Sequence, residues 1–386
     1  MTAVVLLFRA LALRGRPLAA AFSAPLAGTG LAWAAAARSP HGTFGNIAYT
    51  QMDVPVVLQV AALVGLWGVG FLVLLGPATV AAALCARAGA RARLLAAAAG
   101  TGLLVAALAF GAWRLHDDAA VDRVRVALLD LGSGKGPAPD VDSAEGQRLL
   151  AGYAAALERL AAGQRIDMAV LPESALLLRR HALAPLQALT DRHGMRIVLG
   201  AEDRGGQAPR NAALVYMPGA QAPQAYFKHH LIPGIEDRYV PGQARLLLPG
   251  DPATAVAICK DLDFTATARE HARRGARLLL VPAWDFGVDA RMHARMAAMR
   301  GIEGGFAIAR AARDGNLMLS DDRGRVLAEA SAVGTRGPVS LVADLPLRDT
   351  RTPYRFWGDA FGPLCLALAA LLAAGLLRGR ARGRNR

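Results

Sequence analysis

Three residues with chemically versatile side chains follow short apolar runs in the middle of the chain. Glu173 ends the run "IDMAVLPE", Lys228 lies in the segment "YFKHHLIP", and Cys259 follows "ATAVAI" at the start of a charged stretch. Reactive groups in α/β folds gather at the carboxyl ends of strands, where the loops can be shaped around them. We therefore expect Glu173 and Cys259 to lie at equivalent strand ends and to meet in one cleft.

Each of these residues also has an ordinary structural role. A free cysteine is often buried simply as a small apolar residue, a glutamate after a proline can begin a helix, and lysine is normally solvated. Of the three cysteines, Cys85 and Cys365 lie in or at the ends of long apolar runs, so Cys259 has no disulfide partner in its own domain. Taken singly, the residues leave catalytic and structural roles open.

Other kinds of site are disfavoured by residue type and spacing. His229 and His230 are adjacent, and adjacent side chains on an extended strand point to opposite faces, so both can hardly bind one ion. No G-x-S-x-G serine motif occurs, and the glycines of "GIEGG" follow a helical pattern rather than a strand. We expect neither a metal site nor a cofactor.

Apolar residues make up 54% of the chain and charged residues 19%, which is more apolar than an ordinary soluble protein. The excess is concentrated near the two ends, in four runs of roughly bilayer length: Leu18–Ala37, Val54–Ala86, Leu94–Trp113 and the shorter Phe361–Leu377. We expect a membrane region with about three transmembrane helices over residues 1–121, and a C-terminal transmembrane helix with an arginine-rich tail over residues 349–386. A cleaved leader does not explain three runs in succession.

The net charge of +14 is distributed unevenly along the chain. Eight arginines and three aspartates precede Val121, the tail "RGRARGRNR" contributes five more arginines, and the middle of the chain is only weakly basic. Basic residues at alternate ends of membrane spans mark the cytoplasmic side. We therefore expect a multi-pass membrane protein whose middle domain is extracytoplasmic, and no nucleic-acid partner.

Residues 122–348 alternate short apolar runs with amphipathic helical patterns. In "VDRVRVALLDLG", Val124, Val126 and Leu128 fall on one face of a strand. The leucines of residues 143–163 recur at helical spacing, and "DDRG" is typical of a hairpin turn. This alternation predicts an α/β sandwich.

Glu173 in "LPES", Lys228 in "YFKHHLIP" and Cys259 in "AICKD" occur in the order that resembles the nitrilase superfamily of carbon–nitrogen hydrolases, over roughly residues 122–345. The resemblance implies an α-β-β-α sandwich with a Glu-Lys-Cys triad, and Glu236 as an accessory carboxylate. In that triad, Glu173 takes the thiol proton, and Lys228 lowers the thiol pKa and stabilises the oxyanion. Cys259 then carries an acyl thioester, while Lys260 and Asp261 shape the cleft.

The segments "SPHGTFGNIAYTQ" and "LQVAALVGLWGVGFLVLL" resemble the membrane region of the apolipoprotein N-acyltransferases. That family usually has more membrane helices before its nitrilase domain, so the chain is expected to begin partway through this region. The resemblance implies transfer of a fatty acyl group from a phospholipid donor to the N-terminal amine of a lipoprotein, in the cell inner membrane.

Two other functions stay open. A membrane-anchored amidase acting on a small amide would use the same thioester, with water in place of the amine. A catalytically silent membrane scaffold is the third alternative, and the intact Glu-Lys-Cys set argues against it, since a scaffold has no need of all three residues.

Overall fold

The computed structural model describes residues 2–116, 119–120, 122–132 and 136–384, and its chain forms two compact units. One unit combines Met1–Asp118 with Thr352–Arg386, and the other is Ala119–Arg351. The expected domain boundary at residue 121 and the last two residues of the arginine-rich tail lie outside the described residues.

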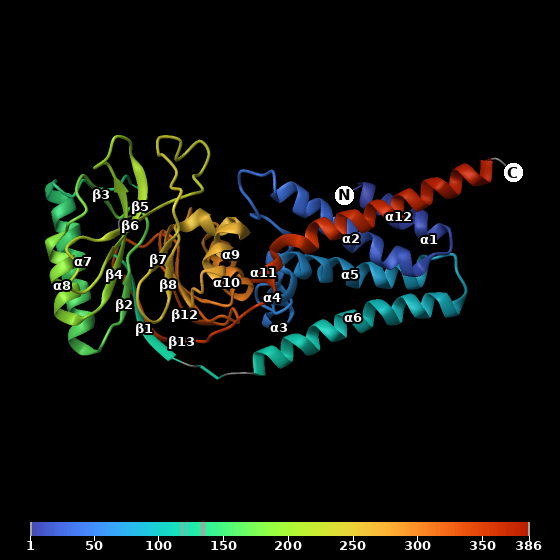
Figure 1. The fold of residues 1–386 in the computed structure, drawn as a ribbon, viewed down its shortest axis with the longest axis horizontal. Helices are drawn as coiled ribbons and strands as arrows, with labels where there is room; N and C mark the ends of the chain where they lie inside the picture. The colour runs from blue at the N-terminus through green and yellow to red at the C-terminus, as the bar shows by residue number, and fades with distance from the viewer. Residues whose placement is uncertain (1, 117–118, 121, 133–135, 385–386) are drawn as a thin grey trace. The chain divides into compact units, whose positions relative to one another are not determined.

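The first unit is helical (Figure 1). Its elements are α1 (Thr2–Leu13), α2 (Pro17–Ala36), η1 (Ile47–Gln51), α3 (Pro55–Leu58), α4 (Ala61–Val64), α5 (Leu66–Cys85), α6 (Ala90–His116), α11 (Tyr354–Trp357), η3 (Gly358–Ala360) and α12 (Phe361–Arg384). Within the described part of the chain, four helices are long and apolar enough to cross a membrane: Pro17–Ala36, Leu66–Cys85, Ala90–His116 and Tyr354–Arg378. They correspond to the four apolar runs of the sequence.

The second of those runs, Val54–Ala86, is not one continuous helix. The short helices α3 and α4 end before Gly65, which has a φ of 71°, and α5 begins after it. A Cβ atom at position 65 would clash with the ring of Tyr354. A left-handed backbone and this close contact both require glycine, so the helix able to span a membrane is the shorter α5.

The second unit is an α-β-β-α sandwich (Figure 1). The strands of its first sheet are, in order, β13 (Val339–Leu347), β1 (Asp122–Asp130), β2 (Met168–Val170), β4 (Arg196–Asp203), β5 (Arg210–Tyr216) and β6 (Gln224–Phe227), with β3 (Leu176–Leu178) also paired to β4. Those of the second are β12 (Val326–Ser331), β11 (Asn316–Ser320), β10 (Ala307–Arg313), β9 (Leu278–Trp284), β8 (Thr254–Val256) and β7 (Leu246–Leu248). Helices α7 (Ala144–Gly163) and α8 (Ala184–His193) cover the first sheet, and α9 (Thr265–Arg273) and α10 (Ala290–Gly304) lie on the side of the second.

The alternation of side chains in β1 explains why two layers pack on the first sheet. Val126 and Leu128 point into the core between the two sheets, whereas Ala127 and Leu129 join the core beneath α7 and α8. All four side chains are essentially buried. A strand buried on both faces suits the centre of a layered α/β domain, so the predicted sandwich is confirmed.

The buried histidine of α9 makes the stability of this unit depend on pH. His271 is fully buried, and burial together with the nearby charge of Arg245 lowers its pKa from the ordinary 6.5 to about 4. The unfolded chain therefore takes up this proton more readily than the folded chain. This contribution to stability is complete above about pH 6.5 and is lost as the pH falls towards 4.

We expect His271→Leu to remove this part of the pH dependence. Between pH 6.5 and pH 4, the free energy of unfolding of the wild type should fall by roughly 3 kcal/mol more than that of the variant. Chemical unfolding of the detergent-solubilised full chain, followed across this pH range, measures the difference. Equal losses in the two proteins would contradict the assignment.

Candidate active site

A lysine and two carboxylates form a buried cluster at one end of the first sheet. Lys228 directly follows β6, and its Nζ lies 2.7 Å from Glu173 Oε1 and 2.8 Å from Glu236 Oε2. All three side chains are nearly inaccessible to solvent. Burial lowers the pKa of Lys228, but the charges of Glu173, Cys259 and Glu236 outweigh it, and the net pKa is raised. The ammonium group is therefore charged and its charge is shared between two carboxylates.

Asn211, at the start of β5, completes the cluster. Its Nδ2 donates hydrogen bonds to Glu173 Oε1 at 2.6 Å and to Glu236 Oε1 at 2.7 Å. Burial is the main cause of the raised pKa of Glu173; the charge of Glu236 adds to it, and Lys228 and Asn211 oppose it. Asn211 could not be predicted from the sequence, because an asparagine at the start of a strand carries no local signal of what it will contact.

Cys259 lies at the start of a short 3-10 helix, η2 (Cys259–Asp263), just beyond β8. It is partly exposed, has a φ of 41°, and its Sγ lies 3.5 Å from the carbonyl oxygen of Trp284. Burial of the thiol and the charge of Glu173 raise its pKa well above the ordinary value, whereas Lys228 lowers it. The net pKa is raised, so the thiol needs a base to take its proton.

Glu173 and Cys259 come from different sheets. Glu173 follows β2 in the first sheet, and its N–H donates a hydrogen bond to the carbonyl oxygen of Ala283 in β9 of the second sheet, at 3.1 Å. Strand β4 passes so close to this turn that a Cβ atom at Gly200 would clash with the backbone of Glu173. The turn is thus held from both sides, which brings the glutamate within electrostatic range of the thiol.

Asp261 links the segment that follows Lys228 to the turn that contains Cys259. Its Oδ1 accepts hydrogen bonds from the backbone N–H groups of His229 and His230, at 3.0 and 2.9 Å. Its Oδ2 accepts from Tyr226 Oη at 2.7 Å and from the N–H of Ile258 at 3.1 Å. Burial raises the pKa of Asp261, but a hydrogen bond from the ring of His230 and the hydrogen bonds named above outweigh it and lower the pKa overall. The carboxylate is therefore ionised and fixed.

Side chains close to Asp261 make ion-pair and stacking contacts with one another. Lys260 Nζ lies 3.1 Å from Asp263 Oδ2. The ring of His229 stacks on Tyr226, and that of His230 stacks on Phe264.

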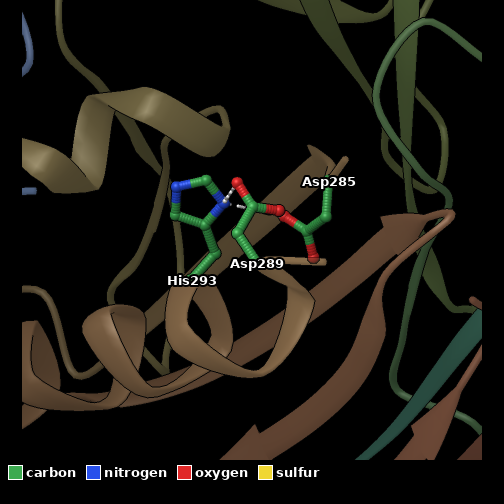
Figure 2. Close-up of side chains that lie close together, drawn as sticks. All are labelled: Asp285, Asp289 and His293. Carbon is green, nitrogen blue, oxygen red and sulfur yellow. Dashed lines mark ion pairs between the residues drawn. The ribbon is translucent and has the colours of Figure 1, made fainter. Parts of the chain in front are cut away.

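Three further residues near the site have donor atoms close enough to surround a cation, namely Asp285, Asp289 and His293 (Figure 2). His293 Nδ1 lies 3.3 Å from Asp285 Oδ1 and 3.4 Å from Asp289 Oδ2. Both oxygens of Asp285, however, accept hydrogen bonds from the guanidinium of Arg310. Burial raises the pKa of Asp285, but the charge of Arg310, its hydrogen bonds and the interaction with His293 together outweigh it, so the pKa is lowered. These contacts are those of a buried ion-pair network, and we assign the group no metal ion.

A cavity of about 210 Å³ opens beside the cluster. Glu173 and Glu236 contribute carboxylates to its lining, and apolar or aromatic side chains make up much of the remainder: Ile232, Ile235, Tyr239, Trp284 and Phe286. Ile235 and Phe286 are each about half exposed, at 54% and 47%. An apolar wall that extends to the surface is suited to a substrate with an apolar part.

The layered fold and this cysteine, lysine and glutamate arrangement define the class to which the domain belongs. Residues 125–352 match the family model described as carbon-nitrogen hydrolase, which is more than half of the chain. The chain therefore belongs to the carbon–nitrogen hydrolase family. With its four helices of membrane-spanning length and composition, it is a membrane protein of that family.

Several relatives of the chain share one name. Apolipoprotein N-acyltransferase 1 of Treponema pallidum is 29% identical over 275 residues, which is 57% of this chain and 50% of that protein. The apolipoprotein N-acyltransferase of Bradyrhizobium diazoefficiens is 28% identical over 382 residues, which is 86% of this chain and 68% of that protein. The apolipoprotein N-acyltransferase of Geobacter metallireducens is 25% identical over 401 residues, which is 93% of this chain and 74% of that protein. The chain spans about half the length of the Treponema relative.

A solved structure supports the fold independently. Saccharomyces cerevisiae Nit3, described as a member of branch 10 of the nitrilase superfamily, superposes with a TM-score of 0.50 at 20% sequence identity. The match covers 59% of this chain and 91% of that one. The nitrilase-like sandwich predicted from the sequence is thus confirmed.

Asn211 offers a direct test of the electrostatics of the cluster. We expect Asn211→Asp to place a third carboxylate against Glu173 and Glu236, and this added negative charge disfavours the thiolate of Cys259. The pH midpoint for alkylation of Cys259 by iodoacetamide should rise by about one unit or more. Quantifying the alkylated Cys259 peptide by mass spectrometry across pH measures this midpoint.

Asn316 provides the matched control, because its Nδ2 donates to Glu329 Oε1 at 2.7 Å outside the cluster. Asn316→Asp should leave the alkylation midpoint where it is in the wild type. If both variants shift the midpoint equally, the effect is not specific to the cluster.

Proposed function

We propose that the chain is a membrane acyltransferase that forms an acyl thioester on Cys259 and passes the acyl group from a phospholipid to the N-terminal amine of a lipoprotein. Glu173 is the general base and acid, Lys228 the oxyanion donor, and Glu236 an accessory carboxylate. The observation that carries this proposal is the buried ion cluster of Lys228, Glu173 and Glu236, which lies within electrostatic range of the thiol of the partly exposed residue Cys259. Perturbed ionisable groups gathered beside a cavity are typical of active sites.

In the first half-reaction, the thiol of Cys259 attacks the carbonyl carbon of an acyl ester. Glu173 takes the thiol proton as the S–C bond forms, and its raised pKa makes it a better proton acceptor than an ordinary carboxylate. The C–O bond to the glycerol then breaks, and Glu173 returns the proton to the leaving alcohol. The products are the thioester on Cys259 and a lysophospholipid.

In the second half-reaction, an amine attacks the thioester carbon. Glu173 takes a proton from the amine nitrogen, the C–S bond breaks, and the proton passes to the departing sulfur. An amide and the free thiol result. Lys228 supplies a positive charge for the oxyanion of both tetrahedral intermediates, and Glu236 shares the ammonium with Glu173, which keeps Lys228 oriented between the two.

Two observations favour acyl transfer over hydrolysis of a small amide. Two relatives that match 86% and 93% of this chain bear the name apolipoprotein N-acyltransferase. In addition, the cavity beside the cluster has a wall of apolar and aromatic side chains that reaches the surface. Such a wall suits a fatty acyl chain better than a small polar amide.

The decisive experiment is mass spectrometry of the full chain after incubation in phospholipid vesicles without an acceptor. We expect an adduct of fatty acyl mass on Cys259, because the thioester cannot be resolved without an amine. Cys259→Ala should carry none. Turnover of small amides by the wild type, with no adduct at any time, would instead identify an amidase.

The rate of adduct formation tests the assigned roles. Glu173→Gln should slow it by about 10²–10⁴-fold through loss of a positioned base, and Lys228→Met by about 10²–10³-fold through loss of an oxyanion donor. Lys260→Ala is the matched control, since Lys260 pairs with Asp263, and it should retain most of the rate. If Lys260→Ala proved as damaging as Lys228→Met, the catalytic lysine would be misassigned.

We also propose that the domain of residues 122–348 is extracytoplasmic, while the N-terminus and the arginine-rich tail are cytoplasmic. Arginines cluster near the start of α2 and from the end of α5 into the first turn of α6, and they recur in the tail. If each of the four candidate helices crosses the membrane, these clusters all fall on one side. Positive residues mark that side as cytoplasmic.

Reporter fusions test this topology. A reporter inserted at Gly205 and one fused after Arg386 should give opposite signals in a paired periplasmic and cytoplasmic assay. The same signal from both sites would contradict the topology and, with it, access of the domain to extracytoplasmic lipoproteins.

A further inference from the structure

Arg313 is a buried arginine close to the candidate site that the mechanism above does not use. It ends β10, where it is the register partner of Trp284 at the end of the parallel neighbour β9. Arg313 is fully inaccessible to solvent. An arginine is rarely buried unless its donors are satisfied and its charge is compensated, so its contacts indicate what it holds.

Those contacts join three separate segments of the domain. The guanidinium carbon lies 4.2 Å from the ring centroid of Trp284. One terminal nitrogen donates to the carbonyl oxygen of Ser174 at 3.2 Å, and the other donates to the carbonyl oxygen of Gly136. A flat group with donors on two sides and two faces for stacking can make all these contacts at once, whereas a lysine ammonium cannot.

Two of the contacted segments carry the groups that act on the thiol. Ser174 directly follows Glu173 and has a φ of 50°, a conformation that is unfavourable for a residue with a side chain. Trp284 presents its carbonyl oxygen 3.5 Å from Cys259 Sγ. Arg313 thus fixes the strained turn beside the base through a hydrogen bond, and the strand end beside the nucleophile through stacking.

The charge of Arg313 adds to this arrangement. Burial lowers its pKa from the ordinary 12.5, and the negative charges of Asp130 and Glu173 are among the groups that oppose the shift. An arginine keeps its proton in proteins, so a permanent positive charge stands behind the turn that carries Glu173. The attraction between the two is mutual, and it favours the ionised form of the base.

We propose that Arg313 is a positioning residue, which holds the Glu173–Ser174 turn and the Trp284 strand end in the geometry that makes Cys259 reactive. It touches none of the reacting atoms itself. This inference rests on the proposed role of Cys259 as the nucleophile, and it predicts that reactivity of the thiol depends on the guanidinium group.

The test compares the alkylation of Cys259 by iodoacetamide in Arg313→Lys, Arg313→Met and the wild-type full chain in detergent, with the Cys259 peptide quantified by mass spectrometry. Arg313→Lys keeps the charge but loses the bridge between two carbonyls, so alkylation should slow by about 10-fold to 100-fold with an unchanged pH midpoint. Arg313→Met also loses the charge, so its midpoint should additionally move to higher pH.

Arg295 is the matched control for loss of a buried arginine. It forms hydrogen bonds to both carboxylate oxygens of Glu329, at 3.1 and 2.9 Å. Arg295→Met should lower the unfolding temperature and leave alkylation of Cys259 unchanged. If Arg313→Lys alkylates within about twofold of the wild type, Arg313 is only structural and the proposal is wrong. Should Arg313→Met fail to fold, Arg313→Lys decides the question alone.

Alkylation separates this inference from the proposed function, because it needs no acyl donor. If no acyl adduct forms on the wild type but alkylation still depends on Arg313, the acyltransferase assignment fails and the positioning role stands. If Cys259 of the wild type resists alkylation from pH 6 to pH 10, both fall.

Discussion

The buried ion cluster of Lys228, Glu173 and Glu236 constrains the whole of this domain. Moving an ammonium group out of water costs several kcal/mol unless oppositely charged partners and hydrogen bonds replace the solvent. Here two carboxylates lie within 2.8 Å of Nζ, and Asn211 donates to both of them. These groups come from the end of β2, the start of β5, the end of β6 and the following loop. A displacement of any of them would leave a buried charge without its partner.

The second sheet supplies the sulfur, so the two sheets must be held in register at this point. The hydrogen bond from the N–H of Glu173 to the carbonyl oxygen of Ala283 and the hydrogen bonds accepted by Asp261 join the segments concerned. They also maintain the left-handed backbone of Cys259, whose φ is 41°. Such a conformation costs about 1–3 kcal/mol and persists only where the surroundings fix it. The same hydrogen bonds therefore hold the two sheets together and fix the position of the thiol.

Features of the fold and the candidate site could be predicted from the sequence where neighbouring residues alone indicate them. Alternate side chains of β1 are buried in the two different cores on either side of its sheet, and this strand is recognisable from its own residues. The four apolar runs likewise correspond to helices of membrane-spanning length. Strands β3, β6 and β7 show no such alternation, because three or four residues are too few to show a period of two. Asn211 and Arg313 were missed for another reason: their partners are 38 and 139 residues away in the chain. Resemblance to a family pointed to Glu173, Lys228 and Cys259, and their catalytic roles stay a prediction.

The chemistry of the cluster is the same for a transferase and a hydrolase, so the difference between them lies in access to the thioester. In the proposed mechanism Glu173 would take a proton from an amine or from water, and Lys228 would stabilise the oxyanion in either case. Water is the more abundant nucleophile, and a transferase must therefore keep it away from the acyl group. A bound acyl chain packed against Ile235, Trp284 and Phe286 would displace water from the cavity wall that these side chains form. If the proposed function holds, the apolar part of the donor would protect the thioester until the amine arrives, whereas a small amide would leave the same wall wet.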